Sequence, residues 1–417
     1  MTEILIAGTG AGSENLLTPE VINALKNSEC IVAHTGKIAL IRRFANQAEL
    51  FELTDFKNLR NLEKLFREIL AVHERVLLLV SGDPGMFSLM SFVRRKFPGV
   101  NLRALPGISS LQVLCARVCE SWHDAVIISG HGREISLVKL LNTVERNRLV
   151  IIFCDGVNSP EKICRELLAL ENICVTIGEN LSLESERISS GAASDFCAEI
   201  FSTNSLMMIR NLEPYTFPRT RLRDDDFVRD PRVKITNRNL RSIILDDLGI
   251  CENSIFWDIG AGTGSICVSV ALENPDCEIH AVDFKAESAR IIRENIREFH
   301  VHNIELHNSR ASEILRELPI PTHVFIGGNG GELCEILEFV KNLGANIRVL
   351  VECVTIESFV TGAAILKHWE NFTAKQVMIS AVSEGESIMK SRSPVMLLSA
   401  KTCAIIEKIS GKISEGE

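Results

Sequence analysis

The sequence contains no apolar run that approaches the roughly 18 residues a membrane-spanning helix needs, and its densest apolar stretches, such as residues 76–80, have strand length. A basic segment followed by an apolar one is also missing near the N-terminus, so we expect no signal peptide, no membrane partner and a cytoplasmic location. Acidic residues outnumber Lys and Arg by 54 to 45, which argues against a nucleic-acid partner. A local arginine cluster could still bind an anionic small molecule.

Closely spaced cysteine pairs are absent too. The 13 cysteines are scattered, no C-x-x-C occurs, and the closest pair, Cys115 and Cys119, has no third cysteine just beyond it. We therefore expect reduced, mostly buried thiols. His300 and His302 form an H-x-H pair, but without a third ligand nearby we interpret them as surface residues and predict no metal site.

Strand-like segments alternate with segments of helical period, which predicts an α/β fold with mainly parallel sheets. A length of 417 residues suggests roughly two to four domains. Thr18 and Pro19 have the form of a helix start, with a capping Thr before Pro at the first helical position. The expected helices include 59–72 and 161–170, and the expected strands are 4–7, 30–33, 76–80, 125–129, 149–154, 255–258, 278–283, 304–307, 323–326, 348–352, 374–381 and 395–399.

The alternation breaks between Glu213 and Arg232. This stretch contains three prolines, three alternating arginines and an acidic triplet at 224–226. We interpret it as an exposed linker, residues 213–232, that separates a domain at 1–212 from a second domain at 233–417.

The second domain begins with a strand that runs into D-x-G-x-G-x-G. A nicotinamide or flavin site typically has G-x-G-x-x-G, but Ser265 occupies that third position here. Asp283 ends the next strand, at about the 20-residue spacing where a carboxylate reaches a ribose diol. The alternative is a glycine turn that merely packs a helix on a strand.

Loop and acid together resemble the S-adenosylmethionine (SAM) site of Rossmann-like methyltransferases. The resemblance implies a set of cofactor-binding residues in this half: Thr236, Asp258, Gly260, Ala261, Gly262, Thr263, Gly264, Asp283 and Ala311. A glycine-rich segment with Gly327 and Gly328 follows the fourth strand, where ligands gather in this fold and a bulky substrate would need room. A flexible loop is the alternative for that segment.

The first domain also carries a glycine loop, after the strand at 4–7. It lacks the third glycine of a dinucleotide site, because residue 13 is Ser, and the next strand ends in His34 instead of an acid. A standard Rossmann site is therefore not favoured here. More informative are Ser81-Gly-Asp-Pro-Gly85, Pro106-Gly-Ile-Ser-Ser110 and His131-Gly-Arg133, each following an expected strand.

This ordered set resembles the tetrapyrrole (corrin/porphyrin) methylase family. That family has two α/β subdomains with a folded SAM molecule between them, which implies SAM-binding residues at Gly8, Gly10, Gly12, Gly82, Asp83, Pro84, Ser109 and Ser110. Singly, these segments could be ordinary turns or helix caps.

The combination resembles the fused, decarboxylating precorrin methyltransferases of cobalamin (vitamin B12) biosynthesis. The expected fold is therefore α/β, a tetrapyrrole-methylase fold followed by a Rossmann-like class I methyltransferase domain. The resemblance implies methylation of carbons 5 and 15 of an anionic tetrapyrrole, removal of carbon dioxide from the acetate on carbon 12, and a homo-oligomer. No metal cofactor is implied.

Carboxylates on such a substrate call for arginine, and we expect His131, Arg133, Gly327, Gly328 and Arg392 to contact it. Asn237 and Asn329 depart from the family's usual residues, which leaves part of the substrate side open. The alternatives are methylation of another tetrapyrrole or small metabolite, and a non-catalytic SAM-binding scaffold. Whether the substrate contains cobalt also stays open.

Overall fold

The computed structural model describes residues 2–45, 47–54, 59–132, 134–216, 222–344, 346–381, 390–391 and 393–402. The chain divides into two compact units, residues 1–214 and 215–417, and each is described by itself. Within the described residues no helix is both long and apolar enough to cross a membrane.

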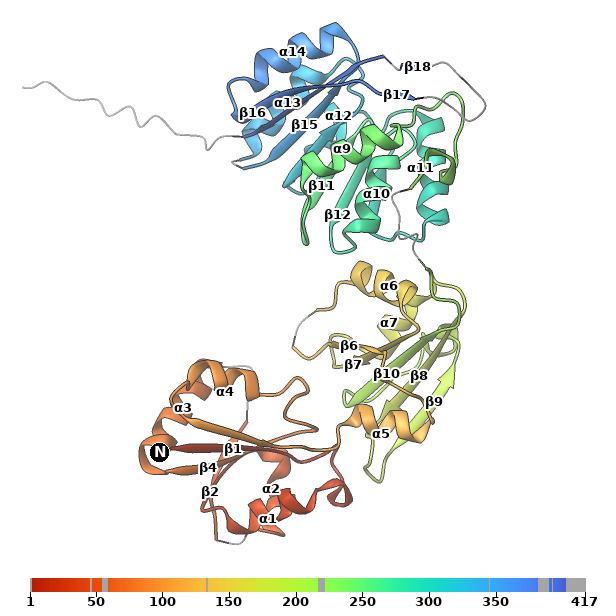
Figure 1. Cartoon of the computed structure of the whole chain (residues 1–417). Helices are drawn as coiled ribbons and strands as arrows, with labels where there is room; N and C mark the ends of the chain where they lie inside the picture. The colour runs from red at the N-terminus through yellow and green to blue at the C-terminus, as the bar shows by residue number, and fades with distance from the viewer. Residues whose placement is uncertain are drawn as a thin grey trace, which may run out of the picture. The chain divides into compact units, whose positions relative to one another are not determined.

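The first unit contains two sheets (Figure 1). The first sheet is entirely parallel and has the order β3-β2-β4-β1-β5, so β1 lies between β4 and β5. The α1 helix begins as expected, because the Thr18 hydroxyl accepts a hydrogen bond from the Val21 N–H at 3.3 Å. The elements here are β1 (Glu3–Gly8), η1 (Glu14–Leu16), α1 (Pro19–Asn27), β2 (Cys30–His34), η2 (Thr35–Lys37), α2 (Ile38–Arg42), β3 (Glu49–Leu53), α3 (Leu59–Val72), β4 (Arg75–Val80), α4 (Met90–Lys96) and β5 (Asn101–Leu105).

The second sheet has the order β6-β7-β10-β8-β9, and only β6 and β7 are parallel. The expectation of mainly parallel sheets is therefore wrong for this half of the unit. The chain passes from β8 to β9 through a short turn without a crossover helix, and such a turn can join only antiparallel strands. Its elements are α5 (Ser110–Arg117), β6 (Val126–Ser129), α6 (Leu137–Arg146), β7 (Leu149–Phe153), α7 (Pro160–Leu167), β8 (Ile173–Glu179), β9 (Arg187–Gly191), α8 (Ala193–Phe196) and β10 (Ser205–Asn211).

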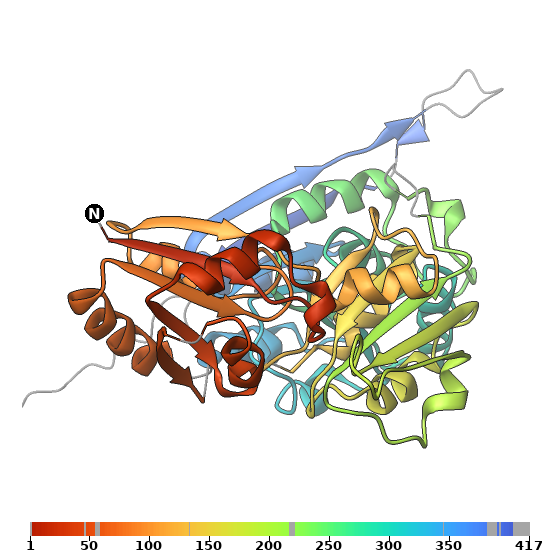
Figure 2. The same ribbon diagram turned by 90° about the horizontal axis from the view of Figure 1, so that it is seen from below.

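The second unit is built on a seven-stranded sheet of order β13-β12-β11-β14-β15-β19-β16. Its first five strands are parallel, and β19 runs antiparallel to both of its neighbours. Figure 2 shows β16 and β19, in blue, running together. The elements are η3 (Asp224–Asp226), α9 (Arg238–Leu248), β11 (Ile255–Ile259), α10 (Ser265–Glu273), β12 (Glu278–Val282), α11 (Ala286–Glu298), β13 (Ile304–His307), α12 (Ala311–Ile314), β14 (His323–Ile326), α13 (Leu333–Leu343), β15 (Arg348–Cys353), α14 (Ile356–Leu366), β16 (Glu370–Val377), β17 (Ser380–Ala381), β18 (Lys390–Ser391) and β19 (Val395–Lys401).

Helices cover both faces of this sheet (Figure 1). Helices α9, α10 and α11 pack on one face, and α12, α13 and α14 pack on the other. Successive residues of β11 point to opposite faces, so buried Phe256 belongs to the first core layer and buried Trp257 to the second. The Rossmann-like fold expected for this half is confirmed.

The segment interpreted as an exposed linker is not exposed throughout. Leu222 and Phe227 are buried in the core of the second unit. The buried Arg241 guanidinium donates to the Leu222 carbonyl at 2.6 Å, pairs with Asp224 at 3.3 Å and lies over the Phe227 ring at 4.8 Å. Residues from 222 onward are thus packed on the second unit, while Arg219 and Arg221 lie outside the described residues.

Candidate active sites

The sequence-predicted loops of the first unit come together at one sheet edge. The carboxyl ends of neighbouring parallel strands meet at the same edge, and β1 pairs with both β4 and β5. The loops that follow these strands are the ones with Gly10, Gly82 and Gly107. Gly10 and Gly82 are bridged by two backbone hydrogen bonds of 3.3 and 2.9 Å.

Glycine is needed where these loops touch. A Cβ on Gly107 would lie 2.2 Å from the Gly82 carbonyl oxygen, and a Cβ on Gly8 would lie 2.4 Å from the same atom. Asp83 then fastens the loops, because its carboxylate accepts hydrogen bonds from the Gly85 N–H at 2.7 Å and the Gly107 N–H at 3.0 Å. The three loops therefore form one connected wall.

A cavity of about 370 Å³ opens beside this wall, between the two sheets of the first unit. Seven of the sequence-predicted residues line it: Gly10, Gly12, Gly82, Asp83, Ser109, Ser110 and His131. Gly8 and Pro84 do not line it; both are buried, and Gly8 serves the close loop contact just described. Arg133 lies outside the described residues.

His131 is held at the cavity by the loop that follows β7. The Asp155 carboxylate accepts a hydrogen bond from the Gly132 N–H at 3.1 Å. The Asn158 amide donates to the Gly130 carbonyl at 2.8 Å and accepts from the Ile135 N–H at 3.0 Å. These bonds on both sides of His131 fix the backbone that carries the imidazole toward the cavity.

In the second unit, the glycine loop after β11 meets the glycine-rich loop after β14. These two strands are paired and mark the point where the strand order reverses, which is where ligands bind in open α/β sheets. Gly260 has a φ of +73°, and a Cβ there would lie 2.2 Å from the Gly328 carbonyl oxygen. Both properties require glycine at position 260.

Asp283 follows β12 and reaches the glycine loop. One carboxylate oxygen accepts a hydrogen bond from the Gly262 N–H at 2.9 Å, and the other accepts from the Lys285 N–H at 3.0 Å. Each carboxylate oxygen carries further lone pairs, so a ribose diol could also donate to this group.

A cavity of about 440 Å³ lies at this edge of the second sheet. Nine of the sequence-predicted residues line it: Thr236, Asp258, Gly260, Ala261, Gly262, Asp283, Ala311, Gly327 and Gly328. Thr263 and Gly264 do not line it; Thr263 is buried, and Gly264, at φ +77°, caps the start of α10. Arg392 lies outside the described residues.

Comparisons with known proteins find family matches for both halves of the chain. The family model of tetrapyrrole (corrin/porphyrin) methylases matches residues 3–196, and that of the precorrin methyltransferase domain matches residues 225–394. A cobalt-precorrin-7 C(5)-methyltransferase of Salmonella typhimurium is 30% identical over 44% of this chain and 88% of its own. The chain belongs to the precorrin methyltransferases. The expected tetrapyrrole-methylase fold of the first half is thereby confirmed as well.

Two further relatives of this precorrin methyltransferase are named for methylation at carbon 15. A precorrin-6Y C(5,15)-methyltransferase (decarboxylating) of Sinorhizobium sp is 27% identical over 78% of this chain and 78% of its own. A probable cobalt-precorrin-6B C(15)-methyltransferase (decarboxylating) of Pyrobaculum calidifontis is 29% identical over 45% of this chain and 97% of its own. The chain therefore combines two methyltransferase domains.

Two carboxyl groups with raised pKa values line the second cavity of this precorrin methyltransferase. Asp258 is fully buried; its Oδ2 accepts from the Cys267 N–H at 3.1 Å, whereas its Oδ1 contacts no donor in the described residues. Burial raises the pKa of Asp258 to about 7. Burial also raises the pKa of Glu352 to about 7, against the opposing effect of nearby Lys234. The unpartnered Oδ1 and the closely packed glycines fit a site that takes a polar ligand at this edge.

Some cavity residues of this precorrin methyltransferase were not predicted from the sequence. Lys37 lines the first cavity, and its burial lowers the pKa of its ammonium group. Lys234, Arg310 and Glu352 line the second cavity. Glu352 could have been identified from its position, because it is an acidic residue near the end of β15. Asp283 holds a similar position just after β12. The lysines lie outside the glycine motifs, so no spacing rule marks them.

Proposed function

We propose that this chain methylates carbons 5 and 15 of precorrin-6Y or its cobalt-containing counterpart and removes carbon dioxide from the acetate on carbon 12. The domain at 1–212 serves carbon 5, and the domain at 233–417 serves carbon 15 and the decarboxylation. The names of the relatives support this pair of reactions. The observation that carries the proposal is the presence of one glycine-walled cavity in each unit, because two methyl transfers need two aligned sites.

SAM, when bound, supplies a methyl group already activated on a sulfonium and leaves as S-adenosylhomocysteine. The protein's main task is to align a nucleophilic ring carbon behind that methyl, and such positioning can account for roughly 7–11 kcal/mol of a barrier. In the first cavity Gly10, Gly12, Gly82 and Ser110 would hold the cofactor. In the second, Gly260, Gly262 and the Asp283 carboxylate would do so.

Cationic side chains on the two cavity walls would bind the acetate and propionate groups of the macrocycle. Lys37 is available in the first cavity, and Lys234 and Arg310 are available in the second. Arg310 is also anchored, since its guanidinium pairs with Glu332 at 2.9 Å and lies over the Phe284 ring at 5.0 Å. An anchored guanidinium presents its remaining N–H groups in a fixed direction.

Glu352 is our candidate for handling a proton in the second reaction. Loss of carbon dioxide leaves an electron pair that the conjugated macrocycle can accept, and a proton must then reach the ring. A carboxyl group with a pKa of about 7 can both hold and release a proton near neutral pH. Lys234 on the same wall could pair with the acetate before it is lost.

Mass spectrometry of the product tests the proposal. The full chain with precorrin-6Y and SAM is expected to add two methyl groups and release one carbon dioxide. Asp283→Ala should leave a product with the carbon 5 methyl alone and its carboxylate intact. Gly10→Val places a branched side chain at φ +69° against Leu16, and it should abolish only the carbon 5 methyl. Loss of the same methyl in both variants would contradict the division of labour.

Two further measurements separate the alternatives. A SAM-binding scaffold predicts saturable binding of S-adenosylhomocysteine with no turnover of any tetrapyrrole, whereas the proposal predicts two binding sites per chain and turnover. Competing substrates with and without cobalt identify the physiological one. A homo-oligomer stays a prediction, which light scattering of the full chain tests.

A further inference from the structure

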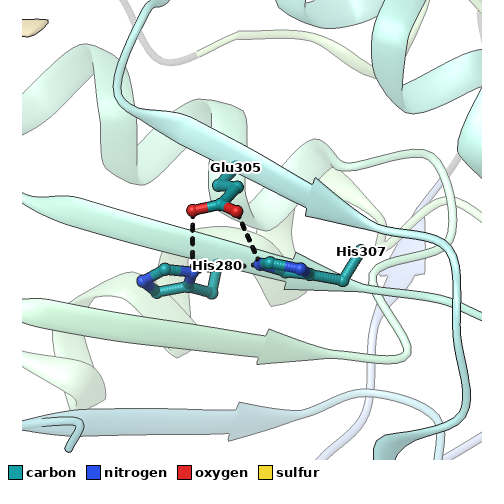
Figure 3. A group of neighbouring side chains, drawn as sticks. All are labelled: His280, Glu305 and His307. Carbon is teal, nitrogen blue, oxygen red and sulfur yellow. Dashed lines mark hydrogen bonds and ion pairs between the residues drawn. The ribbon is translucent and has the colours of Figure 1, made fainter. Parts of the chain in front are cut away.

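Three side chains that can ligate a metal lie close together in the second unit, on neighbouring strands of its sheet (Figure 3). His280 lies on β12, and Glu305 and His307 lie on β13. The parallel register pairs His280 directly with Glu305, and it pairs Val282 with His307. Because Glu305 and His307 are two residues apart on one strand, their side chains share a face of the sheet.

The ligand atoms are close to the spacing that a bound ion would impose. His280 Nδ1 and His307 Nε2 are 3.0 Å apart, and the Glu305 carboxylate is 3.6 Å from the first nitrogen and 3.8 Å from the second. Tetrahedral Zn²⁺ with bonds of about 2.0–2.2 Å places its ligands roughly 3.3 Å from one another. Shifts of a few tenths of an ångström would therefore convert the cluster into three ligands of one ion.

A carboxylate outside the cluster orients His280. The Glu278 carboxylate lies 3.1 Å from His280 Nε2, on the side of the ring away from His307. With the Nε2 proton donated to Glu278, the lone pair of Nδ1 points at the cluster. Carboxylates hydrogen-bonded to the remote nitrogen of a histidine are the usual support of zinc ligands in proteins. The His280 side chain is only 3% exposed, so this orientation is held by packing as well.

The cluster is also accessible to an ion from solvent. The Glu305 side chain is 68% exposed, whereas the His307 side chain is 12% exposed. An ion could enter beside Glu305 and keep a water molecule as its fourth ligand. None of the three residues lines the two cavities described above.

We propose that His280, Glu305 and His307 bind a divalent transition-metal ion of the Zn²⁺ class, with Glu278 supporting His280. The ion would join β12 to β13 at the edge of the sheet. The cluster is connected to the cavity residue Asp283 by two hydrogen bonds. The Asp283 N–H donates to the His307 carbonyl at 3.1 Å, and the Asn308 amide donates to the Asp283 carbonyl at 2.9 Å. Bound metal would thus steady the strand end that presents Asp283.

The first test is calorimetric titration of the metal-free, tag-free full chain with ZnCl₂ alone. One equivalent is expected to bind at this site in the wild type. His307→Gln should remove that binding, and Glu278→Gln should weaken it by about 10- to 100-fold. The matched control is His300→Gln, which removes an exposed imidazole of the same unit and should leave the affinity unchanged.

Cobalt spectroscopy separates this site from the cysteines. Twelve cysteines in the described residues are not in disulfides, and a thiolate ligand would give Co²⁺ an intense charge-transfer absorption. The proposed nitrogen and oxygen ligands predict visible Co²⁺ bands of a four-coordinate site without that absorption, and Zn²⁺ should abolish these bands. Circular dichroism checks that each variant is folded. Binding that persists unchanged in His307→Gln, or no binding by the folded wild type, overturns the proposal.

Discussion

The Asp83 carboxylate accepts a hydrogen bond of 3.0 Å from the Gly107 N–H and so ties two loops that are far apart in the sequence. The second unit repeats the arrangement on a different fold, because the Asp283 carboxylate accepts from the Gly262 N–H at 2.9 Å. In both cavities the acid singled out as a ligand contact therefore also holds the loop on which the ligand would rest. Replacing either acid is expected to change both stability and binding.

The first prediction concerns Asp83→Asn. The amide retains one acceptor but presents N–H groups toward a backbone N–H, so one of the two loop hydrogen bonds is lost. We expect the first unit to lose about 1–3 kcal/mol of stability and its affinity for S-adenosylhomocysteine to fall at least tenfold. Urea unfolding and calorimetry measure the two effects. The control is Asp225→Asn, whose carboxylate is 83% exposed and should change stability by less than about 0.5 kcal/mol.

The second prediction concerns Gly260→Ala. The new methyl group would collide with the Gly328 backbone, and residue 260 would also be strained at its φ of +73°. We expect loss of methylation at carbon 15 with methylation at carbon 5 retained, and destabilisation of the second unit by about 2 kcal/mol or more. Gly331→Ala is a sharp control, because Gly331 has a φ of +94° but a Cβ there would meet nothing within 4 Å. Equal losses in both variants would mean that strain alone, not the loop contact, explains the effect.

The third prediction concerns Arg241→Met. The buried guanidinium donates to the carbonyls of Leu222 and Thr236 and pairs with Asp224. The methionine removes the donor of both carbonyls and the ion pair of Asp224, which keeps its hydrogen bond from the Asn237 amide at 3.1 Å. Loss of one partner of such a network typically costs about 3 kcal/mol or more. Thermal unfolding of the full chain should show the second unit destabilised by this amount. Arg238→Met, on the exposed side of α9, is expected to have almost no effect; similar losses in the two variants would disprove the role of Arg241.

The loops of both sites could be predicted from the sequence because parallel strands impose a simple geometry. Each motif follows a strand, and β1 lies between β4 and β5, so Gly10, Gly82 and Ser109 lie at the same cavity. Predicting this proximity requires no information about side-chain packing. The roles of Gly8 and Gly264 were less predictable. Sequence spacing identifies a glycine in a loop. Only the structure distinguishes a glycine that lines the cavity from Gly8, which contacts another backbone, and from Gly264, which begins a helix at positive φ.

Other features depend on contacts that no local pattern records. Strands β8, β9 and β10 are not among those expected from the sequence. Their antiparallel pairing depends on the turn between β8 and β9 and on the return of β10 between β7 and β8. The packing of 222–227 on the second unit depends on Arg241, a charged residue on a helix that would ordinarily face solvent. The His280 cluster forms through strand register, which joins residues 27 positions apart.

The last prediction is a pH dependence centred on Glu352. Burial raises the pKa of this carboxyl to about 7 in the folded chain, whereas its ordinary value is 4.5. Between those values the folded state binds the proton and the unfolded state does not, so the contribution of Glu352 to stability falls as pH rises from 4.5 to 7 and then stays constant. Glu352→Gln cannot ionise, so its stability relative to the wild type should increase over this range.

Chemical unfolding of both proteins at pH 5 and pH 8 measures this difference in stability. The same difference at both pH values would show that the pKa of Glu352 is not raised in the folded chain. The matched control is Glu370→Gln, on the exposed start of β16, for which the difference from wild type should not change between these values. Activity adds an independent criterion. If Glu352 handles the proton in the second reaction, its variant should lose the inflection near pH 7 in the rate of carbon dioxide release. Methylation at carbon 5 should keep its own pH profile, because that reaction is assigned to the other cavity.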